Sequence, residues 1–413
     1  MEGMEKEGSA DSGGPGSGFL RGERSNHQPA FVELFFDLVV VFALNRVVAT
    51  GTAAMERAGV EVRWYGFLHG ILLILPLLWV WSTTAYVTAR FDPRRTPTRV
   101  LVLGTSLGVL FLGAAAPTAF DGGALIFAGV YLALAVGRSL ALYWMLRQHP
   151  IRRLYLRVLA WSGVSAVPWL LGAVTHAGFF RTLLWVIAIS IDFGAARLGW
   201  PVPRLGRGRI TVWVKAAEYL ADRYRQLMMI ALGESILAVG IAYTGEDGLR
   251  SLTETTALVV AFLTTVLLWR IYSHTAGELF GIAVRSAEDP GRLGLVAQAA
   301  HIVMILGVAA TAVGHELVQT HPTGHTYLSW LGAILGGPAT YLAGRILLEW
   351  LVFSRVSRLR LLGIATLLAL AVPLALAPPL AAAAVVPMVL LVIAFADTRR
   401  AARNPGETPR PPA

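Results

Sequence analysis

Three acidic residues lie in stretches of sequence that are otherwise almost entirely apolar. Glu33 and Asp37 stand four positions apart in FVELFFDLVVVFALNRVV (31–48), and Glu234 stands in LADRYRQLMMIALGESILAVG (220–240). A carboxyl group in apolar surroundings can take up and release a proton, bind a cation, or pair with a basic side chain. We therefore take Asp37 and Glu234 as candidate proton- or cation-binding residues, with a purely structural ion pair as the alternative.

Basic residues in other apolar stretches are the candidate charge partners. Arg223 precedes Glu234 by eleven residues, which places both on one helix face but about 16 Å apart, too far for a direct pair. Arg138 and Arg345 are the other candidate partners for Glu234, unless they extend to the membrane surface instead. Asp192 is a further candidate site residue and a possible partner for Arg138.

Histidines add a second kind of candidate. His301 precedes His315 by fourteen residues, so both lie on roughly one helix face. A proton relay through His301 and a hydrogen-bonded packing role are both consistent with this position. The stretch GHELVQTHPTGH (314–325) contains histidines and a glutamate, but no pair has compact metal-ligand spacing, so no metal site is expected.

The usual motifs of enzymes are not found. GTSLG (104–108) matches the hydrolase elbow pattern but lies in an apolar stretch without a preceding strand, which indicates glycine-mediated helix packing. No phosphate-binding loop, dinucleotide fingerprint or zinc-protease motif occurs. We expect no enzymatic activity and no cofactor. Nucleic acid binding is not expected either, since no basic patch alternates with aromatic residues.

The composition indicates that helices in a lipid bilayer position these residues. Of the 413 residues, 55% are hydrophobic and only 15% are charged, against about 25% charged in soluble domains. Apolar runs near 20 residues long recur, which predicts an all-α polytopic membrane protein. The predicted spans are 32–50, 67–89, 100–119, 124–146, 156–176, 181–199, 223–243, 255–273, 294–316, 327–349, 359–377 and 380–397.

The basic residues set an orientation for these twelve predicted spans. With twelve spans, 25 of the 35 Lys and Arg residues fall in the tails and loops of one side and four in the loops of the other. The rule that basic loops stay inside predicts that both termini are cytoplasmic. The basic side would contact anionic lipid headgroups.

The order of the runs suggests five parts. These are a disordered N-terminal tail (1–30), a first six-helix half (31–199), a cytoplasmic linker (200–222), a second six-helix half (223–397) and a C-terminal tail (398–413).

The two halves resemble each other weakly, which predicts an internal repeat. LLWVWSTTA (77–85) aligns with LLWRIYSHTA (267–276), and YLALAVGRSLALYW (131–144) with YLAGRILLEW (341–350), so that Arg138 corresponds to Arg345. In the opening helices, Asn45 corresponds to Glu234. A parallel 6+6 repeat would place a site between the halves near the middle of the membrane.

Several stretches resemble the bacterial low temperature requirement A proteins over about residues 30–400. They are VELFFDLVVVFAL (32–44), RFD (90–92), the GES motif within 220–240, and LGGPATYLAGR (335–345). The resemblance implies a polytopic protein of the bacterial inner membrane and implies no particular activity. In place of the family's W-W-x-Y-F-D pattern the chain has WRIYSH (269–274), without the acid, for which His274 or Glu278 could substitute.

These observations favour a secondary transporter or ion-coupled permease for an unknown small solute or ion. Asp37, Glu234, Asp192 and His301 would be its ion sites. The competing hypothesis is a membrane protein that transports nothing and instead senses or organises lipid, supporting growth in the cold. The sequence does not predict an oligomeric state.

Overall fold

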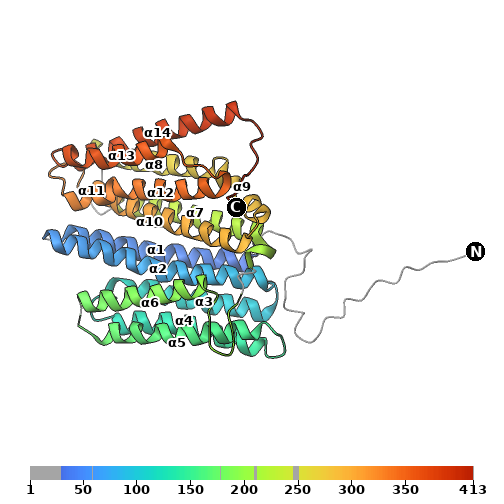
Figure 1. Cartoon of the computed structure of the whole chain (residues 1–413). Coiled ribbons are helices and arrows are strands. Elements are labelled where there is room, and N and C mark those ends of the chain that lie inside the picture. Colours follow the sequence, from blue (N-terminus) through green and yellow to red (C-terminus); the bar gives the residue numbers. More distant parts are fainter. Residues whose placement is uncertain (1–28, 58, 177, 209–211, 245–250, 413) are drawn as a thin grey trace, which may run out of the picture.

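The structure is a computed structural model, which describes residues 29–57, 59–176, 178–208, 212–244 and 251–412. The regular elements of these residues are helices (Figure 1). The first group comprises α1 (Phe31–Glu56), α2 (Val60–Arg90), α3 (Thr96–Ala115), α4 (Ala124–Met145), α5 (Arg152–Val174) and α6 (Phe179–Arg197). The second comprises α7 (Val212–Tyr243), α8 (Leu252–Ser273), α9 (Ala276–Ser286), α10 (Pro290–Thr320), α11 (Leu328–Ile334), α12 (Gly336–Phe353), α13 (Arg358–Leu374) and α14 (Pro379–Arg403).

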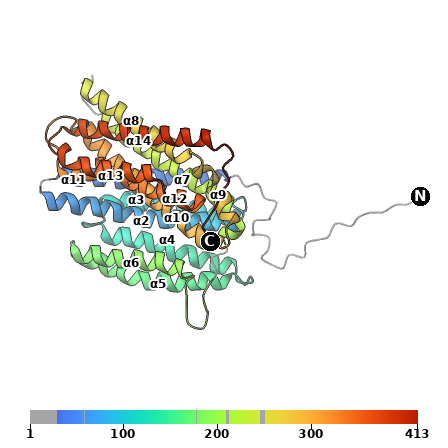
Figure 2. The ribbon, with the colours of Figure 1, turned by 45° about the horizontal axis from the view of Figure 1, so that its top comes forward.

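The long helices run alongside one another and form a single bundle (Figures 1 and 2). In Figure 1 the helices α2 to α6 lie on one side of α1, and α7 to α14 lie on the other. Helix α1 packs against α2 and α3 of its own group and against α7 and α10 of the second group. The interface between the two groups is therefore built around α1, which carries Glu33 and Asp37.

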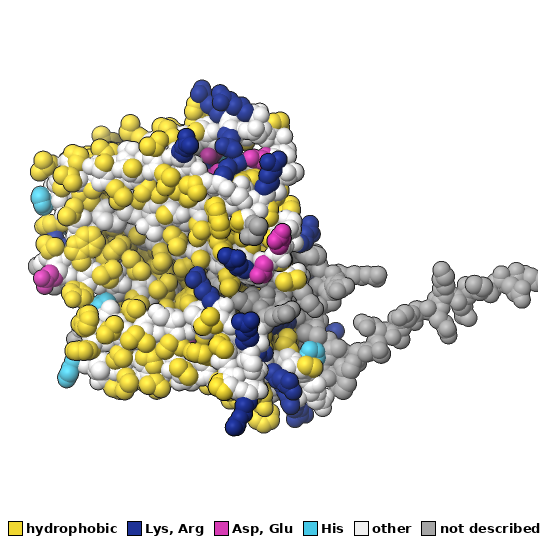
Figure 3. Space-filling model, viewed as in Figure 1, with side chains coloured by type: hydrophobic (Ala, Val, Ile, Leu, Met, Phe, Trp, Pro, Cys, Tyr) yellow, Lys and Arg dark blue, Asp and Glu magenta, His cyan; other side chains and the backbone are white. Residues whose placement is uncertain are grey.

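The bundle has the surface of a membrane protein. Ten helical segments of the described residues are long and apolar enough to cross a bilayer. Large apolar side chains such as Leu107, Leu171 and Val372 are exposed on the flanks, and Figure 3 shows hydrophobic side chains over most of the visible face. Burial in lipid removes the cost of exposing this apolar surface to water.

Basic side chains gather at one end of the bundle, which we call the basic end. It is the end where α1 begins and where α2 and α14 finish, and in Figure 3 the dark blue Lys and Arg side chains cluster there. The uneven charge predicted from the sequence is thus present in the folded molecule.

Each of the twelve predicted spans coincides with helix, but twelve membrane crossings remain a prediction. Helix α13 has only 17 residues, and the predicted span 327–349 is divided between α11 and α12 at Leu335. Helix α7 starts at Val212, within the predicted linker, and is kinked at Ala216. The predicted C-terminal tail is partly structured, because α14 extends to Arg403. The predicted N-terminal tail lies almost wholly outside the described residues.

Helices α10 and α12 approach each other closely because glycines line their contact. A Cβ atom added at Gly307 would lie 2.3 Å from the backbone nitrogen of Tyr341, and one at Gly344 would lie 2.8 Å from the carbonyl oxygen of Ala300. Small residues at such contacts allow backbones to pack together in the absence of a hydrophobic driving force. This contact holds α10 rigidly beside the group interface.

Candidate functional site

A buried ion pair joins α1 to α7 across the interface between the two helix groups. Arg223 donates from Nη1 to Oδ2 of Asp37 at 2.7 Å and from Nη2 to Oδ1 at 2.9 Å. The indole of Trp81 on α2 donates to the same carboxylate at 3.0 Å. Two-point pairing of this kind fixes both distance and orientation. Three helices therefore converge on Asp37.

A second carboxylate, that of Glu33, contacts the same arginine one helical turn nearer the basic end. Glu33 Oε1 is 3.6 Å from Nε of Arg223 and accepts a hydrogen bond from Tyr219. Its other oxygen accepts from the backbone nitrogen of Ala30 at 2.7 Å and so caps the start of α1. Two buried carboxylates thus share one buried guanidinium.

Glu234 lies deeper along the same interface, and its environment is different. Glu234 is 1% exposed, and its carboxylate oxygen Oε1 accepts a hydrogen bond from the side-chain amide of Asn45 over a long 3.4 Å. No Lys or Arg of the described residues forms an ion pair with it. The predicted pairing of Glu234 with Arg138 or Arg345 is therefore not observed, because both arginines are bonded to backbone carbonyls and hydroxyls elsewhere.

Further polar side chains surround Glu234 on the side away from the basic end. Ser235 lies 3.3 Å from Nδ1 of His315 on α10, and Glu316 accepts a hydrogen bond from Thr52 on α1 at 2.7 Å. We call the set Asn45, Thr52, Glu234, Ser235, His315 and Glu316 the carboxyl cluster. The Asp37–Arg223 pair and this cluster form a line of buried polar groups along α1, α7 and α10.

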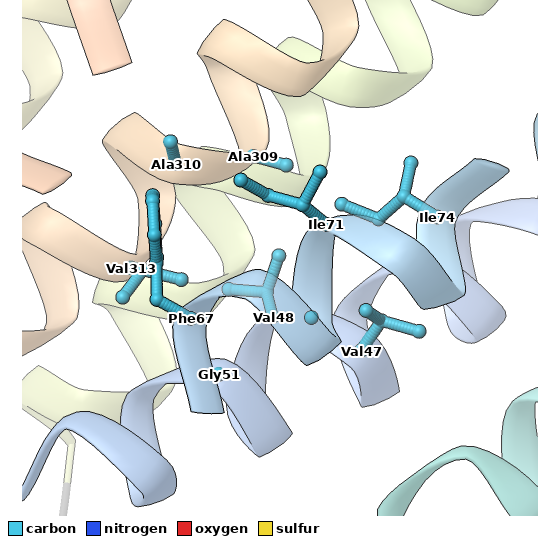
Figure 4. A pocket seen from close by; sticks show the side chains of 10 residues that line it. Val47, Val48, Gly51, Phe67, Ile71, Ile74, Ala309, Ala310 and Val313 are labelled. Carbon is cyan, nitrogen blue, oxygen red and sulfur yellow. The ribbon is translucent and has the colours of Figure 1, made fainter. Parts of the chain in front are cut away.

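A small cavity lies next to this line, between α1, α2 and α10. Its lining consists of apolar side chains and glycines, including Val47, Ile71 and Val313 (Figure 4). Glu234 is not among the lining residues. The cavity therefore separates apolar helix faces and offers no polar group to an ion.

Asp192 on α6 and Arg138 on α4 belong to the first helix group, and their hydrogen bonds go to neither the Asp37–Arg223 pair nor the carboxyl cluster. Asp192 accepts a hydrogen bond from Tyr131 at 2.6 Å. The predicted Asp192–Arg138 pair does not form, because Arg138 donates instead to the hydroxyls of Thr83 and Thr84, at 2.5 and 3.1 Å. No sequence pattern favoured Tyr131 over a basic partner for Asp192.

Arg345 lies on α12 of the second group. Its guanidinium donates to the carbonyl oxygens of Ile271 and His274, both at 2.9 Å, near the end of α8. Arg138 likewise contacts the carbonyl of Val80 on α2. Arg138 thus ties α4 to α2, and Arg345 ties α12 to the end of α8. Glu278, predicted as a substitute acid, lines the cavity beside Arg345.

His301 is fully buried and both its ring nitrogens have partners. Nδ1 lies 2.7 Å from the carbonyl of Ala297, and Nε2 lies 3.0 Å from the hydroxyl of Tyr272. This is consistent with Nδ1–H donating and Nε2 accepting. Rings of Tyr224 and Phe280 pack around it. The geometry favours the packing role over the proton relay.

No group of three or more potential metal ligands occurs among the described residues. What the interface can do is hold charge: one guanidinium contacts both carboxylates near the basic end, while Glu234 has the amide of Asn45 but no paired cation among the described residues. Chemically, a buried carboxyl group without a basic partner can hold a proton or bind a cation.

Comparison with known proteins agrees with the fold. The model of the bacterial low temperature requirement A protein family (LtrA) matches residues 30–395. A protein of Rhizobium meliloti (strain 1021), described as uncharacterized protein RA0937, is 31% identical over 383 residues, covering 91% of this chain and 90% of the relative. No solved structure matches the chain. The chain is thus a member of the bacterial low temperature requirement A protein family.

Proposed function

We propose that the protein is a secondary transporter or ion-coupled permease of the bacterial cytoplasmic membrane, and that Glu234 binds the coupling proton or cation. The observation that carries the proposal is the burial of Glu234 at the interface of the two helix groups without a basic partner. Its substrate would be a small solute or ion.

The energetic cost of that burial supports a role in ion exchange. An ionised carboxylate in apolar surroundings costs several kcal/mol unless it is paired, so it either takes up a proton or binds a cation. A residue serving only the fold would gain more from a matched arginine, as Asp37 does with Arg223. Glu234 can therefore alternate between a neutral and a charged state.

The Asp37–Arg223 pair would close the polar line toward the basic end. Beyond it, Tyr219 and Glu33 contribute further hydrogen bonds. Opening a path from Glu234 to that side requires this pair to separate. Access from the other side would be controlled at Thr52 and Glu316.

The arrangement of the helices supports a repeat, as many transporters have. Helix α1 packs on α2 and α3, as α7 packs on α8 and α10; α4 packs on α3 and α5, as α12 packs on α10 and α13. Asn45 and Glu234, predicted as equivalent positions, meet where α1 contacts α7. Sites near the membrane midplane at a repeat interface are typical of such folds.

Proteoliposomes containing a pH-sensitive dye would test the proposal. Imposed proton, sodium and potassium gradients should produce flux with the wild-type protein and none with Glu234→Gln. Glu61→Gln is a matched control, since Glu61 is exposed at the start of α2. If no gradient produced flux, and Glu234→Gln behaved as wild type does, the transport proposal would be abandoned.

The alternative is a membrane protein that senses or organises lipid without transporting a solute. Such a protein needs no exchangeable ion site, so Asp37, Asp192 and Glu234 would all be closed in ion pairs. Of these three, only Asp37 has an ion pair among the described contacts. The geometry therefore favours transport.

A further inference from the structure

A second polar site lies apart from the carboxyl cluster, in a cavity near the basic end. The cavity opens between α2, α4 and α5 and is bounded on one side by α10. Its empty space, including the part open to solvent, is about 760 Å³. Two arginines, Arg90 and Arg138, line it, and no carboxylate among the described residues does.

The charge of Arg138 is not neutralised by the contacts that hold it. Its guanidinium donates to Thr83, Thr84 and the carbonyl of Val80, all of them neutral acceptors. These contacts fix the side chain in place but leave a full positive charge at the cavity wall. A fixed, partly desolvated guanidinium is a strong recognition group for carboxylate and phosphate.

Gln298 on α10 adds a hydrogen-bond donor that has no acceptor. Its side chain is 6% exposed, and its Oε1 accepts from the hydroxyl of Tyr86 at 3.0 Å. That bond orients the amide and leaves Nε2 buried and without a partner. An unsatisfied buried donor costs about 1–3 kcal/mol, which an acceptor atom in the cavity would recover.

The rest of the wall is mostly apolar. Leu142, Leu154, Val158, Trp200 and Leu295 are among the lining residues. A ligand that filled the cavity would therefore combine an anionic group with an apolar body.

The corresponding cavity of the second helix group has a different charge balance. Arg345, predicted as the equivalent of Arg138, lines it together with three other arginines, and four carboxylates line it too. Arg360 pairs there with Glu349 and Asp397. The positive charges of this cavity are thus neutralised within the protein, whereas those of the first cavity are not.

We propose that the cavity around Arg90, Arg138 and Gln298 binds an organic anion, a carboxylate or phosphate ester attached to an apolar group. The anionic group accepts hydrogen bonds from Gln298 Nε2 and lies against the two guanidinium groups. The apolar group lies among the leucines of α4 and α5. This proposal concerns binding and does not depend on ion coupling at Glu234.

Two sources could supply such an anion, and binding experiments on the full chain in a neutral maltoside detergent separate them. In one, native mass spectrometry compares added phosphatidylglycerol with phosphatidylcholine. In the other, equilibrium dialysis measures phenyl phosphate. We expect saturable binding of one anion per chain in at least one of the two experiments. Retention of phosphatidylglycerol would indicate a membrane lipid, and binding of phenyl phosphate a soluble anion from the basic side.

Variants tie that binding to the cavity. Gln298→Glu keeps the size of the side chain and adds a negative charge, so affinity for the anion should fall at least tenfold. Arg99→Gln is the matched control, because Arg99 is exposed on α3 near the same end and does not line the cavity; its affinity should stay within twofold of wild type. Circular dichroism confirms folding of both.

The proposal is wrong if neither experiment detects a saturable anion. It is equally wrong if folded Gln298→Glu binds as tightly as the wild type, or if Arg99→Gln weakens binding as much as Gln298→Glu does, because the attraction would then be a general effect of surface charge.

Discussion

Asp37 and Arg223, separated by 186 positions in the sequence, form a two-point ion pair that is buried between the helix groups. Both side chains are nearly inaccessible, at 6% and 1% exposed. The pair fastens α1 to α7 at the level where Trp81 also contacts the carboxylate. The stability of the interface and the proposed access to Glu234 therefore depend on the same contact.

Removing one member of this pair should destabilise the protein strongly. Asp37→Asn leaves a buried, partly unpaired guanidinium, so we expect a loss of about 3–5 kcal/mol in the free energy of unfolding. Unfolding in mixed micelles with increasing dodecyl sulfate measures it. The exposed pair between Arg285 and Glu218 is the control, and Arg285→Gln should cost at most about 1 kcal/mol. Equal effects of the two substitutions would contradict the structural role of the Asp37–Arg223 pair.

Glu234→Gln should behave in the opposite way. The amide is neutral and nearly the same size, so it removes the cost of a buried carboxylate without leaving a charge unpaired. We expect the free energy of unfolding to stay within about 1 kcal/mol of wild type or to rise, while ion flux is lost. The same micelle unfolding assay checks this. A loss as large as that of Asp37→Asn would show that Glu234 has a structural charge partner.

The close contact between α10 and α12 predicts that Gly307 tolerates no side chain. Gly307→Ala would bring Cβ to 2.3 Å from the backbone of Tyr341, so the helices must separate. We expect a loss of about 1–3 kcal/mol in the free energy of unfolding. Gly129→Ala on α4 is the control, since no atom lies within 4 Å of the added Cβ; it should be neutral or slightly stabilising. If both substitutions were neutral, the helices would not be packed as closely as described.

The proposed orientation can be tested because the chain contains no cysteine. A single cysteine at Arg152 on the basic end, or at His325 between α10 and α11, gives one labelling site per protein. Impermeant maleimide added to intact spheroplasts should label the His325→Cys variant, and should label Arg152→Cys only after lysis. The reverse pattern would show that the basic end faces outward.

The sequence by itself determined where the helices lie. Runs of apolar residues predicted the membrane-spanning helices; the predicted span 124–146, for example, corresponds to α4. The prediction works because a segment in lipid must form its backbone hydrogen bonds internally, as a helix does, and must present apolar side chains to the lipid. Helical periodicity also predicted that Arg223 and Glu234 lie on one face of a helix but too far apart to pair, and the two residues do not form an ion pair. The short helix α9 and the break at Leu335 were not predicted, although Gly336, Gly337 and Pro338, which directly follow the break, are residue types that interrupt helices.

Only the tertiary structure decided which polar residues meet. Asp37 selects Arg223, Asp192 selects Tyr131, and Glu234 receives the amide of Asn45 rather than an arginine. Periodicity reports which face of a helix a residue occupies, but it carries no information about which distant helix covers that face. Lateral packing between helices makes that choice, and with it the difference between a carboxylate paired with an arginine and one that contacts an amide.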